Sequence, residues 1–386
     1  MKHQAKKQTR NQHMPVVIVC ILILVLAVMG LGMHFIKKYI PTKERMNLTE
    51  YYGQPGDGEM AVVLGTEIME ERALMSGDQI YLPLDMVNTY LNQRYYWDSA
   101  DQQVLYATPS ELQYYPAAES GEGDVWLKDG TVYLRLGFVQ KFTDLDAMYM
   151  KIRTELQSST DLPECRQRQL KKIQVSVIRW NQVSDPDRCE DGGYINLSGR
   201  LEDWAQVATM DGYIGYVQKD TIASAETKDF ERSFEKEEYT YLTMDGKVNM
   251  SWHQVTSQDA NTYLADTIAN VSGVNVISPT WYYIQDTAGN IGNIASADYV
   301  ALAHERGLKV WGLIDNFTAE VSTTDTLSQL SSRQNMIQQL IQSATTVGLD
   351  GINVDFETLS EDAGPHFLEF LRELLLNVIR IILFFR

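Results

Sequence analysis

The chain has 386 residues and a globular composition, a length that suits about two to four domains. The first 45 residues hold eight Lys and Arg residues and one Glu, so the remainder carries 25 basic and 50 acidic residues, a net charge of −25. A surface this acidic repels phosphate backbones and argues against nucleic acid as a partner.

The N-terminal segment predicts a membrane anchor. Residues 1–15 are polar and basic, and residues 16–36 contain one His and are otherwise apolar or glycine. That run is long enough to cross a bilayer as a helix. A cleaved signal peptide is the rival interpretation, but Lys37, Lys38 and Tyr39 follow in place of a small-residue cleavage site, so we favour an uncleaved transmembrane helix. The flanking basic residues are nearly balanced and do not fix its orientation.

The sequence has three cysteines, and they leave one question open. Cys20 lies in the apolar run and is most simply a small hydrophobic residue. Cys165 and Cys189 can form a disulfide if that region lies outside the cell, but two cysteines alone do not decide it. No CxxC motif or His/Cys cluster suggests a metal site.

Residues 46–155 predict a first small α+β module. Its expected elements are strands at 61–64, 79–82 and 104–107 and a helix at 84–91, and 116–124 reads as an acidic linker. The stretch DQIYLPLDMVNTYLNQRYYWDSADQQVLYA resembles the extracellular module named after the N-terminal domain of copper amine oxidases, and a similar half-repeat follows at 123–142. The resemblance implies a stalk or wall-contact module without copper, because no copper-ligand spacing is present.

Residues 172–223 predict several short strands. The stretch from Trp204 to Ile222 resembles the last strands of bacterial SH3-like domains, with a hairpin turn at Asp211-Gly212. Its aromatic residues either bind a peptide or fill the core of a small β-barrel. Residues 224–240 are rich in charge with almost no apolar period, which predicts a solvated linker.

From Lys247 onward the pattern alternates between strand and helix, which predicts a parallel sheet. The expected strands are 248–252, 274–284, 309–317 and 350–357. The expected helices are 257–270, one capped by Ser296 that ends at Gly307, and one from Ser332 to Gly348.

The last of these strands carries the most informative pattern. Asn353, Asp355 and Glu357 alternate with apolar residues, so one face of the strand presents an amide and two carboxyl groups. Because the flanking segments look like core helices, we expect this row to face an interior. Closely spaced buried carboxyls can share a proton and raise one pKa, which suits acid catalysis.

The stretch DGINVDFE resembles the strand-four signature D-G-x-D-x-D-x-E of glycoside hydrolase family 18, the group of chitinases and peptidoglycan N-acetylglucosaminidases. Asp350, Gly351, Asp355 and Glu357 match it, and Asn353 departs from it, as in a cell-wall branch that includes spore-cortex hydrolases. The resemblance implies that residues 247–386 form the first half of a (β/α)8 barrel.

The resemblance also implies a retaining, substrate-assisted reaction without a metal or organic cofactor. Glu357 would protonate the leaving oxygen and then act as base, and Asp355 would orient the acetamido group that attacks the sugar. Asn353 and Asp350 would support the row. The substrate would be an N-acetylglucosamine glycan such as peptidoglycan or chitin, which places the bulk of the chain outside the cell membrane and its N-terminus in the cytoplasm. The alternative is a non-catalytic wall-binding or tethering protein.

Five further residues are weaker candidates for contact with substrate. Trp281 and Tyr282 either stack on sugar rings or pack in the core. Asp315 and Asn316 end the third expected strand, and Trp252 ends the first. All five would lie near the carboxyl ends of strands, where barrel enzymes place their active sites.

The C-terminal end predicts an interrupted barrel. Residues 247–386 number 140, against about 250 for a whole (β/α)8 barrel. Residues 374–385 are apolar on all sides with only Asn377 and Arg380 as polar residues, yet they are too few to span a membrane. We therefore expect four strands, a truncated or shifted reading frame beyond them, and an inactive chain in that form.

Overall fold

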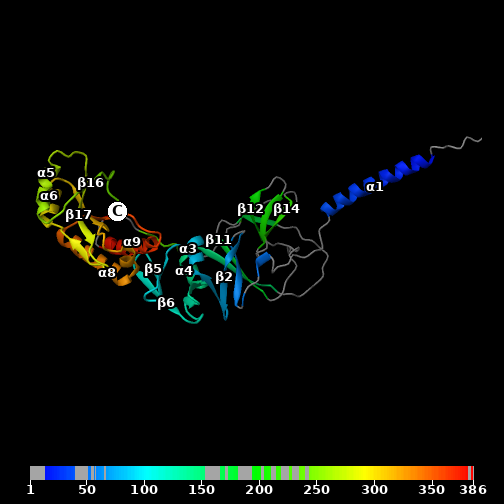
Figure 1. Ribbon diagram of the computed structural model, residues 1–386, viewed down its shortest axis with the longest axis horizontal. Helices are drawn as coiled ribbons and strands as arrows, with labels where there is room; N and C mark the ends of the chain where they lie inside the picture. Colours follow the sequence, from blue (N-terminus) through cyan, green and yellow to red (C-terminus); the bar gives the residue numbers. More distant parts are fainter. Residues whose placement is uncertain are drawn as a thin grey trace, which may run out of the picture. The chain divides into compact units, whose positions relative to one another are not determined.

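The computed structural model describes residues 14–39, 51–53, 56, 58–64, 67–152, 166–169, 173–180, 194–200, 204–209, 214–218, 226–227, 234–239, 243–380 and 384–385 (Figure 1). The chain divides into two compact units. One comprises Met1–Gln54 with Ser184–Arg188, and the other comprises Pro55–Val183 with Cys189–Arg386.

The first unit contains the helix α1, Met14–Tyr39. A helix was predicted here, and large apolar side chains such as Ile23 and Leu24 are exposed along it. Among the described residues, however, no helix combines the length and the apolar character needed to cross a bilayer. The predicted membrane anchor at 16–36 therefore gains no support from the fold.

The second unit begins with a ten-stranded, largely antiparallel sheet. Its strands run in the order β4-β5-β6-β7-β8-β3-β2-β1-β11-β9. They are β1 Glu59–Leu64, β2 Glu67–Ser76, β3 Gln79–Pro83, β4 Tyr95–Asp98, β5 Gln103–Ala107, β6 Leu112–Ala118, β7 Val125–Lys128, β8 Thr131–Arg135, β9 Leu145–Ile152 and β11 Ile173–Trp180, with helices α3 Leu84–Tyr90 and α4 Leu136–Phe142 after β3 and β8.

This sheet confirms the strands and the helix predicted between residues 61 and 107. The two strand–helix pairs, β3 with α3 and β8 with α4, correspond to the predicted half-repeat. The Asp129-Gly130 turn between β7 and β8 has positive φ at both residues, 50° and 81°, as a tight hairpin of this type requires. The predicted linker at 116–124 is partly wrong, because β6 continues to Ala118 and pairs in parallel with β7.

A second sheet has five strands in the order β14-β13-β12-β10-β15. They are β10 Arg166–Gln169, β12 Tyr194–Arg200, β13 Trp204–Thr209, β14 Ile214–Gln218 and β15 Glu226–Thr227. The predicted SH3-like region 172–223 is divided, because β11 pairs with β1 and β9 in the first sheet. The predicted turn at Asp211-Gly212 and the two cysteines, Cys165 and Cys189, lie outside the described residues.

The described end of the charged linker is largely exposed, as predicted, but it also contacts the front module. Glu237 forms an ion pair of 2.9 Å with Arg94 of the first sheet. The Arg94 guanidinium lies over the ring of Tyr239, 4.2 Å from its centroid, and Tyr239 donates a hydrogen bond of 2.7 Å to Glu237. The linker is therefore attached to the front module at residues 237–239.

From residue 250 the second unit has the predicted alternation of strand and helix, which Figure 1 traces through yellow to red. The strands are β16 Met250–His253, β17 Val276–Ile284, β18 Ile291–Asn293, β19 Lys309–Asp315, β20 Gly351–Asp355 and β21 Phe384–Phe385. The helices are the 3-10 turn η2 Asp259–Tyr263, α5 Leu264–Ile268, α6 Ala297–Glu305, α7 Thr323–Ser328, α8 Leu330–Val347 and α9 Ala363–Arg380.

The predicted parallel sheet is confirmed. Strands β16, β17, β19, β20 and β21 pair in parallel in that order, and β18 adds to β17 as a short antiparallel hairpin. The Ser296 hydroxyl accepts a hydrogen bond from the N–H of Tyr299 and caps α6, as predicted. Gly348 ends α8 with a φ of 80°, which the absence of a side chain permits.

Helix α9, Ala363–Arg380, includes residues 374–380 of the apolar C-terminal segment. Helix α9 continues through Arg380, and Leu374 and Val378 are buried against the sheet because they lie on its apolar stripe. Strand β21 then pairs in parallel with β20, with Phe384 opposite Gly351. The segment thus extends the βα pattern by one strand beyond the four that were predicted.

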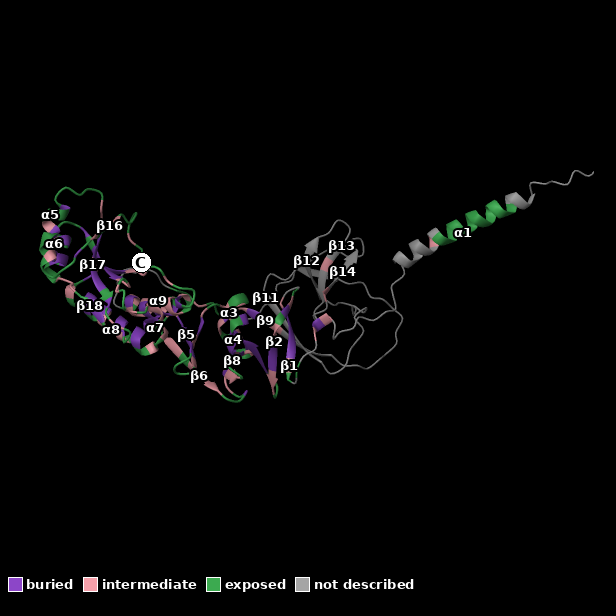
Figure 2. Cartoon of the chain, in the orientation of Figure 1, coloured by how far each residue is buried: buried purple, intermediate pink, exposed green. Residues whose placement is uncertain are grey.

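The parallel sheet has two different faces, and its strands are buried over much of their length (Figure 2). On one face Ile277, Val310, Ile314 and Ile352 join the apolar core beneath the helices. The other face carries residues of the opposite parity, among them Ser278 and Asn353. This second face is the one that would line the interior of a barrel.

Charged side chains are buried where β4 contacts α8 and α9. Arg333 of α8 is 0% exposed and donates from Nε to Glu373 of α9 at 2.9 Å. It also donates from Nη1 to the Tyr96 hydroxyl at 3.1 Å. Burial raises the pKa of Glu373 to about 7, although the Arg333 charge opposes that shift. The front module therefore contacts the α/β part through Tyr96, whose hydroxyl accepts a hydrogen bond from a buried ion pair of α8 and α9.

Candidate active site

The carboxyl end of β20 carries the predicted polar row. Asn353 is 6% exposed, and its amide donates a hydrogen bond of 3.2 Å to the Ser278 hydroxyl on β17. Asp355 is half-buried and is the last residue of β20, and Glu357 is exposed two residues beyond it. The predicted strand at 350–357 is therefore shorter than expected, and Glu357 lies in the loop that follows it.

The loop that contains Glu357 is anchored by Phe356, whose side chain lies on the helix side of the sheet. Phe356 packs on α9, with its ring stacked on Phe370 at 5.6 Å between centroids. Because neighbouring residues of an extended chain point to opposite sides, this contact directs Glu357 away from the helices. Thr358 then has a φ of 55°, which is unusual for a β-branched residue and is a feature that gathers at functional sites.

Asn316, at the end of β19, binds the backbone of Glu357 on both sides. Its amide oxygen accepts from the Glu357 N–H at 2.8 Å, and its amide nitrogen donates to the Glu357 carbonyl at 2.9 Å. The same nitrogen also donates to the Thr323 hydroxyl of α7 at 3.0 Å. Asn316 was predicted to contact substrate, but its amide is occupied with the main chain.

Asp315 lies beside Asp355. The two residues are direct partners in the parallel register of β19 and β20, and Asp315 is in turn the partner of Tyr283 on β17. Burial raises the pKa of Asp315, the N–H of Phe317 opposes the shift by a hydrogen bond, and the negative charge of Asp355 adds to it. The structure thus brings two of the predicted carboxyls together across neighbouring strands.

Asp350 lies outside this site. It accepts hydrogen bonds from His304 Nε2 and Lys309 Nζ, both at 2.7 Å, and from the Val310 N–H at 2.8 Å, all at the amino end of the sheet. At roughly 3.3 Å per residue along a strand, it is about 16 Å from Asp355. Its predicted place in the row is therefore wrong, and its contacts join β19 to β20 at the opposite edge.

Of the two alternatives for Trp281 and Tyr282, packing in the core is the one that the structure shows. Trp281 is buried, and its indole N–H donates to Asn261 at 2.8 Å. Tyr282 is buried as well, with its hydroxyl 2.9 Å from that of Ser343 on α8. A register shift in β17 between Thr280 and Tyr282 places two consecutive side chains on the helix side, so neither ring is available to a ligand.

Other aromatic side chains are accessible near the same edge. Trp252, which was predicted, is 63% exposed and pairs with Ser278 on the inner face. Tyr283 and Phe317 were not predicted and are 42% and 55% exposed. Tyr283 lies over Gly292 of β18, where a Cβ atom would meet the ring at 2.0 Å. Phe317 could have been noticed from the sequence, because it directly follows Asp315-Asn316.

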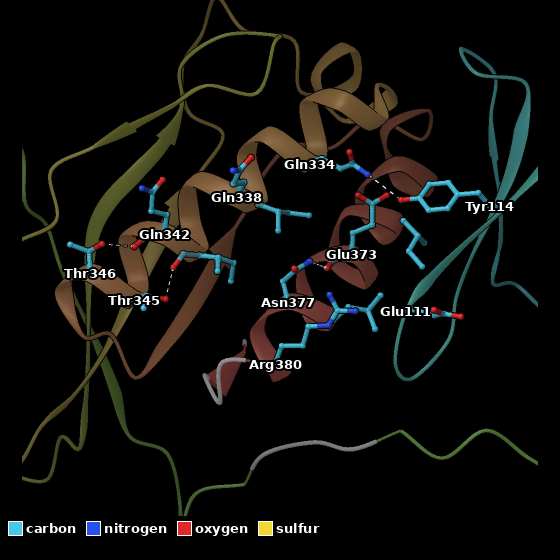
Figure 3. Close-up of a pocket in the computed structure, with 14 residues that line it drawn as sticks. Glu111, Tyr114, Gln334, Gln338, Gln342, Thr345, Thr346, Glu373, Asn377 and Arg380 are labelled. Carbon is cyan, nitrogen blue, oxygen red and sulfur yellow. Dashed lines mark hydrogen bonds between the residues drawn. The ribbon is translucent and has the colours of Figure 1, made fainter.

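A large pocket lies elsewhere. It has a volume of about 810 Å³ and is formed by α8, α9 and the β5–β6 region (Figure 3). Figure 3 shows its polar lining, which includes Gln338, Gln342, Asn377 and Arg380. Its carboxyl groups are Glu111 and Glu373, and Glu373 is bound to Arg333. Because Glu373 is held by Arg333, we look for the acid group at the strand ends, where barrel enzymes place their active sites.

Comparison with known proteins gives a limited result. No family model matches the sequence, and no match is found among curated proteins. Among solved structures, the chain is similar to a chitinase from Chromobacterium violaceum, with 17% identity over 36% of this chain and 44% of that one at a TM-score of 0.31.

Two further structures illustrate the range of these similarities. A chitinase from Bacteroides thetaiotaomicron has 17% identity over 33% of this chain and 42% of that one, at a TM-score of 0.28. The spore cortex-lytic enzyme SleL of Bacillus megaterium has 13% identity over 35% of this chain and 33% of that one, at a TM-score of 0.30.

The chain spans less than half the length of these structures. A similarity over so small a part of each chain is not evidence about catalysis. The resemblances of residues 46–155 and 172–223 to extracellular modules stay predictions.

Proposed function

We propose that this chain is a glycoside hydrolase of the family 18 type that cleaves N-acetylglucosamine glycans. The observation that supports it best is the grouping of Asp315, Asp355 and Glu357 at one edge of a parallel sheet. Two carboxyls are half-buried and side by side, and the third is exposed in the adjoining loop. That combination places an accessible carboxyl group next to a close carboxyl pair in which burial raises the pKa of Asp315.

Glu357 is the proposed acid and base. Its proton passes to the glycosidic oxygen as the bond from that oxygen to the anomeric carbon breaks. The acetamido carbonyl oxygen of the same sugar forms the new bond to that carbon and gives an oxazolinium ion. Water then attacks the anomeric carbon and returns a proton to Glu357. This attack breaks the bond to the acetamido oxygen, and the anomeric configuration is retained overall.

Asp355 is the proposed orienting group. As a carboxylate it accepts the acetamido N–H and stabilises the positive charge that develops on the oxazolinium ion. Asn353 cannot ionise, and its amide is bonded to Ser278, so it supports the row by position alone. This division of roles requires a substrate with an N-acetyl group, which both peptidoglycan and chitin carry.

The exposed aromatic rings support a sugar substrate. Trp252 and Tyr283 lie on the inner-face side of β16 and β17, and Phe317 follows β19. Flat apolar rings beside polar groups are suited to sugar faces, which expose C–H bonds. From the substrate we also propose that this part of the chain acts outside the cytoplasm.

The test is hydrolysis of N-acetylglucosamine oligomers by a form of the protein with a complete (β/α)8 barrel, because the 386-residue chain alone is expected to be inactive. Glu357→Gln keeps the side-chain shape but removes the acid, so we expect a loss of roughly 10²–10⁴-fold in rate. Glu361→Gln, the same change at an exposed position four residues on, is the matched control and should leave the rate unchanged. The anomeric configuration of the first product, followed by NMR, should be retained.

Two results would contradict the proposal. One is an unchanged rate in Glu357→Gln, which would remove the assigned acid. The other is binding of the oligomers without any hydrolysis by the unaltered protein, which would favour a wall-binding or tethering role.

A further inference from the structure

Asp315 lies directly beside Asp355 on the neighbouring strand, although it is not part of the recognised motif. The two residues are register partners on neighbouring parallel strands, with β19 and β20 about 4.8 Å apart at that point. Side chains of register partners point to the same face of a sheet, so both carboxyls leave the backbone on the inner face. Both are half-buried.

Among the described residues, the other neighbours of Asp355 on that face do not supply a second carboxyl group at the same level. Asn353, two residues earlier on β20, is neutral and donates to Ser278. Glu357 lies beyond the strand end and is exposed, and Tyr283 of β17 is the partner of Asp315 on its far side. Asp315 is thus the carboxyl that faces Asp355 directly.

The strand ends that carry this pair are held in place. Asn316 follows Asp315 and hydrogen-bonds both backbone groups of Glu357, two residues after Asp355. The Asp315 carboxylate in turn accepts from the N–H of Phe317 at 3.0 Å, which fixes its own turn. The two strands therefore cannot separate here without breaking these bonds.

We propose that Asp315 is the proton partner of Asp355: the two carboxyls share one proton, which resides mainly on Asp315 and leaves Asp355 ionised. Two adjacent half-buried carboxylates repel each other, so holding one proton between them lowers the electrostatic cost. Burial and the charge of Asp355 both raise the pKa of Asp315, which agrees with the proton residing there.

This arrangement deepens the proposed function and rests on it for its catalytic meaning. An ionised Asp355 can accept the acetamido N–H, and Asp315 acts through Asp355 without touching the sugar. Asp315 is therefore a positioning residue. Asn353 on β20 cannot carry a charge, and Asp315 on the neighbouring strand β19 supplies the additional carboxyl group.

The first test does not depend on activity. Carboxyl ¹³C NMR titration of the protein should give Asp315 a midpoint above that of an ordinary aspartate. In Asp355→Asn the like charge is gone, and the Asp315 midpoint should fall. Asp298→Asn, at an exposed position on α6, is the control and should leave it unchanged. An Asp315 midpoint that does not respond to Asp355→Asn overturns the proposal.

The second test moves a carboxyl group from β19 to β20. Asp315→Asn should lower kcat by about 10²-fold, near the lower end of the effect of acid–base groups, with KM changed little. The double variant Asp315→Asn/Asn353→Asp returns a carboxyl to the neighbourhood of Asp355 and should recover most of that loss. A double variant no better than Asp315→Asn would contradict the role of the shared proton.

The two proposals fail in different ways. If the NMR coupling is present but the unaltered protein hydrolyses no N-acetylated glycan, the carboxyl pair stands and the assigned reaction is wrong. If hydrolysis depends on Glu357 but the coupling is absent, the reaction stands and Asp315 is not the proton partner.

Discussion

Asn316 binds both the N–H and the carbonyl of Glu357, at 2.8 and 2.9 Å. One side chain thus replaces, at the end of the sheet, the two backbone bonds that a longer β19 would have made. An exposed glutamate in a loop would otherwise sample many backbone conformations, and positioning of an acid within a fraction of an ångström affects its rate. The bonds from Asn316 restrict that sampling.

Asn316→Leu is expected to reduce both the stability of the protein and its kcat on N-acetylated oligomers. Leucine has a similar size but makes neither bond, so we expect about 1–3 kcal/mol lower free energy of unfolding and a loss of tenfold or more in kcat. Asn335→Leu is the control, because Asn335 also bonds the main chain but on the β17–β18 hairpin. It should lower stability without a comparable loss in kcat. Equal kcat losses in both variants would contradict the positioning role.

Asp350→Asn is expected to weaken the fold and reduce its sensitivity to acid. Burial opposes the charge of Asp350, but the bonds from Lys309, the Val310 N–H and His304 outweigh it, and the pKa of Asp350 is lowered. A lowered pKa means that the stabilisation is present above the ordinary aspartate range and is lost as the pH falls through the folded-state pKa.

The expected loss for Asp350→Asn at pH 7 is about 1–2 kcal/mol, since His304 and Lys309 are about half exposed and solvent weakens their charges. Chemical denaturation at pH 7 and at pH 3 measures it, and the difference from the unaltered protein should shrink at pH 3. A difference that grows at pH 3 would show that the pKa of Asp350 is not lowered. Activity should change little, because the residue lies at the opposite edge of the sheet.

Arg333→Met is expected to be strongly destabilising, and more so at high pH. The change leaves the Glu373 carboxyl buried without its cation, which typically costs about 3–5 kcal/mol. The pKa of Glu373 is already raised to about 7 in the folded protein. Protonated Glu373 therefore favours the folded state. This contribution to the free energy of unfolding is fully present below the ordinary glutamate pKa and is lost as the pH rises through about 7.

Denaturation of Arg333→Met at pH 6 and pH 8 checks this. The loss should be larger at pH 8, where Glu373 must ionise without a partner. Arg333→Met/Glu373→Leu removes both charges and should recover most of the stability. If the double variant is as unstable as the single one, the ion pair is not the reason for the effect.

Protease added to intact cells tests the proposed location. If the part of the chain that follows α1 lies outside the cytoplasm, the protease should remove it, whereas a cytoplasmic marker stays intact. The same protein in lysed cells must be cleaved, as proof that it is susceptible. Complete protection in intact cells would contradict the location and weaken the assignment of a wall glycan as substrate.

The parallel α/β part could be predicted because its signals are local. Apolar periods, the Ser296 cap and the glycines that end the helices fixed the order of strands and helices. The alternation in β20 likewise placed Asn353 and Asp355 on one face. The continuation of α9 through Arg380 depends on a non-local contact, because Glu373 is buried against Arg333 of another helix, which no period reveals.

The candidate site could be predicted only in part, because spacing is a local signal and several contacts of the site are not local. Spacing identified Asp355 and Glu357, but it could not show that Asp350 lies at the other end of its strand, bonded to Lys309. The contact between Asp315 and Asp355 depends on the register of two strands 40 residues apart in sequence. Register is a property of the assembled sheet, and it was visible only in the structure.

The extra residue in β17 separates the packing of the helix-side core from the register of the inner face. Because Trp281 is accommodated as a bulge, every residue after it is displaced by one step relative to β19, and Tyr283 takes the position beside Asp315. Deletion of Trp281 would remove the bulge and restore a regular strand, in which Tyr282 still pairs with Ile314 and Tyr283 with Asp315. A one-codon deletion at Trp281 would therefore remove a large ring from the helix-side core and leave the residues of the inner face beside Asp315 unchanged.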